Sequence, residues 1–338
     1  MARWSFVAAF LLTAAELFLW KGRRAKLGFV RRLVRARGYT WSYLEKQNAT
    51  TIGDKSATVI FVHGFSSDKH AWLDVAMHVT ADLNLRLLVP DLPGHGATTP
   101  FSSKDDFGVH AQVWNLEAFI SQTVGLDSPV HLVGYSMGGL IAGVFAATFP
   151  HLVQSLTLVS PAGITMPTKS PVVRLFDDDG IALMAATTVD DVEALLDFAD
   201  SKRGTRSRTL LKMYAAVQKS RESLVTKIFY DLEPERSTLE EHIPRIDADM
   251  VVLWGKEDQI LDVSCVQRIQ ALGRRTVVVN GCGHDLPSAR PQLCADHISR
   301  MIVQSRRRDK MLDTSTYTWT TTNSTLMDSM YAEMSMHD

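Results

Sequence analysis

The stretch that decides the fold is VHLVGYSMGG at residues 130–139, which runs directly into LIAGVFAATF at residues 140–149. A short apolar run ends in Gly134-Tyr135-Ser136-Met137-Gly138, and a helical pattern of small residues begins immediately afterwards. A Gly-X-Ser-X-Gly turn needs this strand–turn–helix context if its serine is to be exposed at the edge of a sheet. The flanking glycines let strand and helix crowd together without side-chain collisions. The alternative, a Gly/Ser turn without a chemical role, fits this context less well.

Outward from this turn, short apolar runs alternate with helical patterns. The runs lie at 57–62, 85–90, 130–135, 155–160, 249–255 and 275–281. They are rich in Val and Leu and lack polar alternation, which is typical of strands buried on both faces. Val109, Val113, Leu116 and Ile120 form one apolar stripe at helical spacing. The sequence therefore predicts an α/β fold with a mostly parallel sheet flanked by helices, and residues 39–45 are expected to add an edge strand.

The strand pattern is interrupted once. Residues 56–163 and 246–303 carry the predicted core, whereas residues 164–245 show only helical patterns and many charges. Thr188 is the expected N-cap of one helix in this insertion, with Asp190 and Asp191 in its first turn. We interpret the insertion as a helical cap. Residues 304–338 are rich in Ser, Thr and Met without long periodicity and are expected to be a disordered tail.

Ser136 needs a base, because a serine hydroxyl is a weak nucleophile. Histidine oriented by a carboxylate is the usual base, and in folds with this turn the chain order is serine, acid, histidine. Asp258 follows the run at 249–255, and His284 follows the run at 275–281, so both lie just past the carboxyl ends of predicted strands. The rival acids are Glu257 and Asp262, and Asp285 is expected to have a local structural role. We predict a catalytic triad of Ser136, Asp258 and His284.

The tetrahedral intermediate of such a reaction carries an oxyanion that needs preorganised donors. One expected donor is the backbone N–H of Met137, which follows the nucleophile. The other is the N–H of Phe65 in His63-Gly64-Phe65, just after the run at 57–62. His95, in the turn-rich loop at 91–96, is expected to fix that loop by hydrogen bonding.

Bulk properties exclude several other classes. The chain has 338 residues and a formal net charge of −1, which makes no case for nucleic-acid binding. Its three cysteines lack metal-ligand spacing and are expected to be free thiols. No dinucleotide fingerprint, phosphate loop or metal-ligand cluster is present in the sequence, so we expect no cofactor and no metal.

The N-terminus is expected to attach the protein to a membrane. Residues 4–20, WSFVAAFLLTAAELFLW, are mostly apolar and are bracketed by Trp4 and Trp20. We predict a single anchor at 1–20, because about 17–25 apolar residues span a bilayer and bulky residues stand where a signal peptide would be cleaved. Residues 21–55 hold a basic juxtamembrane segment, which predicts a cytosolic body.

Within this basic segment, Leu27, Val30, Leu33 and Val34 suggest an amphipathic helix on an anionic membrane surface; the alternative is a solvated linker. The glycosylation triplets at 48–50 and 323–325 are interpreted as incidental, although their use would reverse the orientation.

The chain also resembles a known family. HGFSSDKHAW (63–72), DLPGHG (91–96), HLVGYSMGG (131–139), SPAG (160–163), WGKEDQILDVS (254–264) and GCGH (281–284) are similar to α/β-hydrolases. More narrowly, they look like the membrane-anchored monoacylglycerol lipases of the α/β-hydrolase-domain-containing group, over residues 20 to 300. The resemblance implies Ser136, Asp258 and His284 as triad, Phe65 and Met137 as oxyanion donors, and hydrolysis of monoacylglycerols or lysophospholipids without a cofactor.

Two alternative functions stay open at this point. Related serine hydrolases with a similar turn and helical cap cleave carbon–carbon bonds in ring-opened aromatic dienes, but such enzymes are usually soluble. The chain could also be a non-catalytic, membrane-tethered interaction module, since a fold alone does not establish activity. A lipid ester as substrate is favoured, because an enzyme held at a membrane meets poorly soluble esters at high local concentration.

Overall fold

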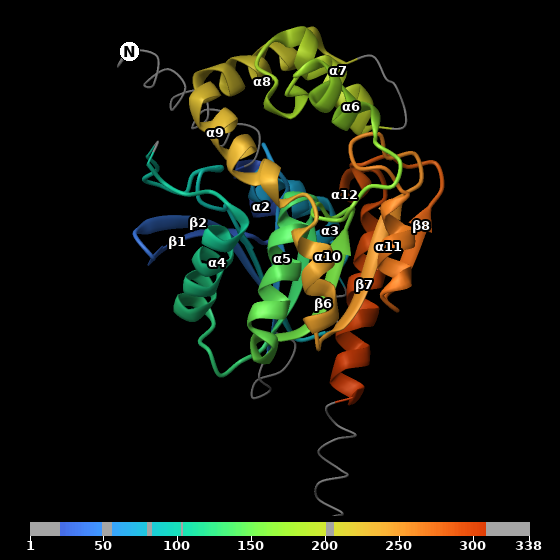
Figure 1. Cartoon of the computed structure of the whole chain (residues 1–338). Helices are drawn as coiled ribbons and strands as arrows, with labels where there is room; N and C mark the ends of the chain where they lie inside the picture. Colours follow the sequence, from blue (N-terminus) through green and yellow to red (C-terminus); the bar gives the residue numbers. More distant parts are fainter. Residues whose placement is uncertain (1–20, 49–55, 80–82, 103, 201–205, 309–338) are drawn as a thin grey trace, which may run out of the picture.

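A computed structural model of the chain describes residues 21–48, 56–79, 83–102, 104–200 and 206–308. Its strands form one sheet in the order β1-β2-β4-β3-β5-β6-β7-β8 (Figure 1). Their bounds are β1 (Val30–Ala36), β2 (Tyr39–Asn48), β3 (Ala57–Val62), β4 (Leu85–Pro90), β5 (Val130–Tyr135), β6 (Val153–Val159), β7 (Asp249–Gly255) and β8 (Arg275–Val279). The strands β3 to β8 are parallel, and β1 and β2 are antiparallel additions. The predicted α/β class is therefore confirmed.

Helices cover both faces of this sheet. One face is covered by α4 (Val109–Thr123), α5 (Met137–Thr148), α10 (Thr238–His242) and α11 (Cys265–Ala271). The other is covered by α3 (Leu73–Ala76), α12 (Leu286–Ala289) and the helical residues 291–308. In β3, Ile60 and Val62 belong to the first cluster and Val59 and Phe61 to the second. Burial on both faces explains why the strand sequences show no polar alternation.

The insertion lies above the carboxyl ends of the central strands (Figure 1). It contains α6 (Pro171–Asp179), α7 (Val189–Ala199), α8 (Arg208–Ser220) and α9 (Glu222–Leu232). It has an apolar cluster of its own that includes Val192 and Leu211. Thr188 caps α7 as expected, with its side chain accepting the Asp191 N–H at 3.1 Å. Leu239 of α10 instead packs in the core of the sheet, so the part that overhangs the sheet spans α6 to α9.

The N-terminal part differs from the sequence-based expectation. The helix α2 (Lys21–Lys26) ends before Gly28, whose φ is +78°, and residues 30–36 form the edge strand β1 in place of the expected amphipathic helix. The reason is the two-residue turn Arg37-Gly38, with φ of +47° and +82°, which folds β1 back onto β2. Residues 39–45, expected at the edge, therefore lie one strand inside it.

Two further predictions fall on the ends of the chain. The predicted anchor at 1–20 lies outside the described residues. Among the residues that are described, no helix has the length and apolar character needed to cross a bilayer. At the other end, the last helix continues to residue 308, five residues beyond the expected end of the core at 303, and residues 309–338 lie outside the described part.

Candidate active site

Ser136 occupies the turn between β5 and α5. It has φ 54° and ψ −121°, a left-handed conformation that costs a non-glycine residue about 1–3 kcal/mol. A Cβ on Gly138 would lie 2.3 Å from the backbone oxygens of Val62 and His63, and a Cβ on Gly134 would lie 2.4 Å from the oxygen of Gly138. Both glycines are therefore required by the close approach of β3, β5 and α5, and the strained turn presents the serine hydroxyl at the strand ends.

Asp258 and His284 come from the loops after β7 and β8. The Nε2 of His284 lies 3.0 Å from the Oγ of Ser136, and its Nδ1 lies 2.8 Å from the Oδ2 of Asp258. The other oxygen of Asp258, Oδ1, accepts the backbone N–H groups of Ile260 and Leu261, each at 2.9 Å. All three functional groups are buried. The structure thus brings the three predicted residues into one continuous hydrogen-bonded relay.

The rival carboxylates have other partners. Glu257 accepts the backbone N–H of Cys282 at 2.8 Å, and Asp262 accepts that of Ser264 at 2.8 Å. Asp285 follows the histidine, and burial raises the pKa of its carboxyl, with a side-chain hydrogen bond to Ser288 acting in the opposite direction. Each of these carboxylates stabilises a loop locally, whereas Asp258 faces the imidazole.

The predicted oxyanion donors belong to two segments that adjoin Ser136. Met137 is the first residue of α5, where helix geometry leaves a backbone N–H without an intrahelical acceptor. Phe65 follows Gly64, and a Cβ on Gly64 would lie 3.2 Å from the Cβ of Ser136. The loop that carries Phe65 therefore passes directly beside the nucleophile. His95 is buried with its Nδ1 3.3 Å from the Pro93 oxygen, in agreement with the expected loop-fixing role.

A buried ion pair that we did not predict holds this loop in place. Lys69 and Asp91 have side chains that are 1% and 0% exposed, and Nζ donates to Oδ2 at 2.7 Å. The same carboxylate accepts the backbone N–H groups of Lys69 and Ala97, both at 2.8 Å. Lysine is almost never fully buried unless it is paired. No local pattern distinguishes Lys69 from a surface lysine, because its partner lies in the loop after a different strand.

A cavity of about 990 Å³ opens above Ser136 and His284, between the sheet and the insertion. Its apolar lining includes Leu195, Leu196, Leu211, Val225, Ile228 and Ile260. Its polar lining includes Asp68, His70, Arg206, Tyr214, Gln218 and Arg221. The cavity is large enough for a drug-sized or lipid-sized molecule. The insertion therefore supplies most of the apolar surface that a substrate would contact.

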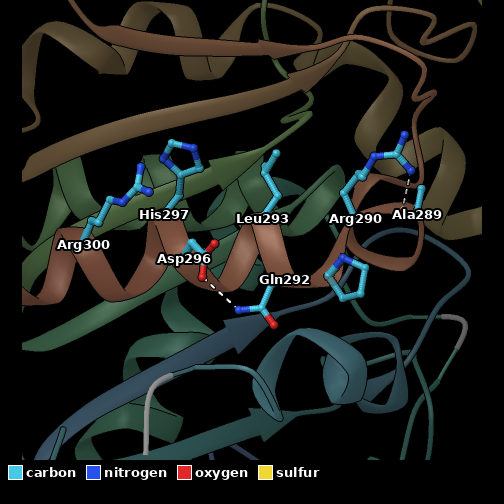
Figure 2. Close-up of a pocket in the computed structure, with 8 residues that line it drawn as sticks. Ala289, Arg290, Gln292, Leu293, Asp296, His297 and Arg300 are labelled. Carbon is cyan, nitrogen blue, oxygen red and sulfur yellow. Dashed lines mark hydrogen bonds between the residues drawn. The ribbon is translucent and has the colours of Figure 1, made fainter. Parts of the chain in front are cut away.

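A second, shallower groove of about 560 Å³ runs along the helical residues 291–308 (Figure 2). Figure 2 shows Arg290, His297 and Arg300 projecting to one side, while Gln292 donates a hydrogen bond to Asp296 at 2.9 Å on the other. Burial lowers the pKa of His297, and Arg300 and Arg275 lower it further. None of the relay residues lines this groove, so it is separate from the site above.

In the described part of the chain, no group of three or more His, Cys, Asp or Glu side chains is arranged to hold a metal ion. Cys265, Cys282 and Cys294 are buried free thiols.

The fold and the relay define the class of protein. A family model described as alpha/beta hydrolase fold matches residues 57–288, more than half of the chain, and this range contains the Ser136 turn, Asp258 and His284. The chain therefore belongs to the alpha/beta hydrolase fold family.

Within that family, the chain belongs with the ABHD6 group. It is 33% identical over 322 residues to Monoacylglycerol lipase abhd6-A of Xenopus laevis, covering 90% of this chain and 93% of that protein. It is 32% identical over 324 residues to Monoacylglycerol lipase ABHD6 of Homo sapiens, covering 91% and 94%.

Solved structures share this fold. A crystal structure of a membrane phospholipase A, described as a novel bacterial virulence factor, has a TM-score of 0.76 and 28% identity, covering 89% of this chain and 93% of that one. A meta-cleavage product hydrolase from Pseudomonas fluorescens IP01 shares the fold, with a TM-score of 0.65 at 18% identity.

Proposed function

We propose that the chain is a membrane-associated serine hydrolase that cleaves monoacylglycerols to glycerol and free fatty acid through an acyl-enzyme on Ser136. The observation that carries the proposal is the relay from Asp258 through His284 to Ser136 at the floor of an apolar cavity. The names of the relatives, monoacylglycerol lipases at 31–33% identity, support the substrate class.

The mechanism follows from the hydrogen bonds. His284 accepts the Ser136 proton at Nε2 while Oγ attacks the ester carbonyl, and the N–H groups of Phe65 and Met137 donate to the oxyanion. Asp258 stabilises the imidazolium through its hydrogen bond to Nδ1. The intermediate collapses by breaking the ester C–O bond, and His284 gives its proton to the departing glycerol oxygen. Water, deprotonated by His284, then attacks the acyl-enzyme, and its collapse returns the proton to Ser136 and releases fatty acid.

The apolar lining of the cavity supports a substrate with a single long acyl chain. Its apolar side chains lie on α7, α8 and α9, and in the loop after Asp258, so they enclose the space above the nucleophile. Excluding water from this space strengthens the hydrogen bonds to the oxyanion, because electrostatic interactions grow as the local dielectric falls. A glycerol head group would leave through the polar part of the lining.

Attachment to a membrane is the second part of the proposal. The cationic helix α2 follows the apolar stretch at 4–20, and Arg23 forms an ion pair with Asp74 at the rim of the cavity. Leu210 and Met213 of α8 also line the cavity and are 58% and 44% exposed. Apolar and cationic side chains together suit an anionic lipid surface. The basic segment favours a catalytic domain on the cytosolic side.

The proposed reaction is tested with the full-length protein in detergent or vesicles. Wild type should release fatty acid from a monoacylglycerol and react with a fluorophosphonate probe, and Ser136→Ala should lose both activities. Ser207→Ala is a control serine variant in the same cavity, where the side chain makes no capping hydrogen bond, and it should keep probe labelling. Labelling of Ser136→Ala at the wild-type rate would exclude Ser136 as nucleophile. Labelling without monoacylglycerol hydrolysis would retain the serine hydrolase and exclude this substrate class.

The membrane part has its own test. Full-length protein should stay in the membrane pellet after alkaline carbonate extraction, and added protease should degrade the catalytic domain only from the cytosolic side. Release into the supernatant would contradict the anchor.

A further inference from the structure

The insertion contacts the loop beside the nucleophile in two ways. The ring of Phe65 packs edge-on against Phe229 of α9, with ring centroids 6.3 Å apart, and a side chain of α8 forms a hydrogen bond to the backbone. Tyr214 of α8 donates a hydrogen bond from its hydroxyl to the backbone oxygen of Ser66 at 3.2 Å. Gln218, one turn further along α8 and buried, donates to the same hydroxyl at 3.3 Å. With one group donating to the tyrosine oxygen, its own proton points to Ser66.

Tyr214 is partly exposed, and its hydroxyl lies between two hydrogen-bonding groups. The residue is 38% exposed overall. Burial raises the pKa of the hydroxyl to about 12, and the charge of Asp68 acts in the same direction. The hydroxyl is therefore protonated at neutral pH and acts as a hydrogen-bond donor.

Ser66 itself is held in an unfavourable backbone conformation. Its φ is +53°, in the left-handed region that favours glycine. Its side-chain Oγ is buried and has no hydrogen-bond partner within the described residues, so the side chain does not stabilise this conformation. A residue other than glycine, asparagine or aspartate loses about 1–2 kcal/mol in this region. The hydrogen bond from Tyr214 acts on the peptide group that this strained torsion orients.

Both ends of the loop are fixed by the core, and its middle is fixed by the insertion. At one end, His63 accepts the Leu92 N–H on Nε2 at 3.1 Å. At the other, Lys69 is bound to Asp91 through its backbone and its side chain. Between them lie Phe65 and Ser66, and the hydrogen bond that the structure gives to the Ser66 carbonyl comes from Tyr214.

We propose that Tyr214 is a positioning residue that holds the Phe65 N–H in place through the Ser66 peptide, so that the oxyanion site is complete only when α8 is seated on the sheet. This inference rests on the proposed serine hydrolase mechanism, in which Phe65 donates to the oxyanion. The insertion then has two roles, because the same helix that encloses the acyl chain also orders the loop that stabilises the transition state.

The test compares Tyr214→Phe, which removes one oxygen, with Tyr230→Phe. Tyr230 is a 53% exposed tyrosine on α9 that does not line the cavity. Removing an oxyanion donor outright costs about 100- to 1000-fold in kcat, so a misplaced donor should cost about tenfold, with KM changing less than about twofold. Tyr230→Phe should stay within about twofold of wild type in both parameters.

The decisive comparison repeats Tyr214→Phe in a protein that also carries Ser66→Gly. Glycine adopts a φ of +53° without strain and loses no hydrogen bond of the serine side chain. In Ser66→Gly, the further change Tyr214→Phe should therefore lower kcat by less than about threefold. The proposal would be overturned if Tyr214→Phe kept a wild-type kcat or raised KM with kcat unchanged. It would also be overturned if Tyr230→Phe lost as much kcat, or if Tyr214→Phe caused the same tenfold loss in the Ser66→Gly background.

The rate of fluorophosphonate labelling is measured on the same variants. This probe reacts with the serine and places an oxygen where the oxyanion forms, so its rate should fall in the same order as kcat. If wild type labels but does not hydrolyse monoacylglycerol, the substrate proposal fails and the labelling rates still decide the role of Tyr214.

Discussion

Replacing Asp258 with asparagine changes one atom of the relay, and the surrounding hydrogen bonds determine how the new side chain is oriented. Oδ1 of Asp258 accepts two backbone N–H groups, from Ile260 and Leu261, at 2.9 Å each. An amide NH₂ in that place would set donors against donors, so the carbonyl oxygen of the asparagine must stay there. The NH₂ group then faces Nδ1 of His284, which has to accept a hydrogen bond where it formerly donated one.

The consequence for His284 is the wrong tautomer. A neutral imidazole with a lone pair on Nδ1 carries its proton on Nε2, the atom that lies 3.0 Å from the Ser136 hydroxyl. That nitrogen can no longer accept the serine proton, and the charge that stabilises the imidazolium is lost as well. We expect kcat to fall by about 10⁴-fold, the loss typical of this change in a serine–histidine–aspartate triad, which equals about 5.4 kcal/mol.

The assay is single-turnover acylation with a monoacylglycerol and with a chromogenic ester, together with the rate of fluorophosphonate labelling. Asp258→Asn keeps the side-chain volume, so the variant should fold normally, and urea denaturation checks this. Glu257→Gln and Asp262→Asn are the matched controls, and each should retain kcat within about threefold because its partners are local backbone groups. If Asp258→Asn kept kcat within tenfold of wild type, or if a control variant lost more than Asp258→Asn, the assignment of the acid would be wrong.

Two further predictions concern stability. Lys69→Met leaves the Asp91 carboxylate buried without its ammonium partner and should lower the free energy of unfolding, measured by urea denaturation, by about 3–5 kcal/mol. Lys219→Met breaks an exposed pair and should lower it by less than about 1 kcal/mol. Equal losses would contradict the argument from burial. Burial lowers the pKa of His131 from 6.5 to about 3, with Arg306 adding to the effect. Between these values the unfolded chain binds a proton that the folded chain does not, so stability falls as pH falls. His131→Asn should therefore remove about 2 kcal/mol of the destabilisation measured between pH 7 and pH 5, and an unchanged pH dependence would exclude this histidine as its source.

Much of the fold was predictable because it depends on local patterns. Runs of Val and Leu without polar alternation indicate strands that are buried on both faces. Each predicted core run overlaps a strand, and the runs at 155–160 and 275–281 extend one and two residues past β6 and β8. The turn around Ser136 was also predictable, because its glycines are required by steric contacts within one strand–turn–helix unit. The chain order of Ser136, Asp258 and His284 followed from the same pattern, since each residue comes just after a predicted strand.

The parts that were not predictable depend on which segments meet in space. Residues 30–36 carry an apolar pattern compatible with a helix, and pairing with β2 through the Arg37-Gly38 turn makes them a strand. Asp258 was preferred to Glu257 and Asp262 from its position just past a strand, but the contact itself depends on the path of the loop after β7, which turns Asp258 towards His284. The partner of Tyr214 lies 148 residues earlier in the chain.

For this protein, the sequence alone determined the order of the core strands along the chain, the strained serine turn and the positions at which the acid and base enter. Those features follow from torsional preferences and from the periodicity of burial, which act over a few residues. The tertiary structure decided which carboxylate faces the imidazole, how Lys69 became buried and how α8 reaches the Ser66 carbonyl. These contacts join loops on different strands, and their geometry exists only once the sheet and the insertion have packed together.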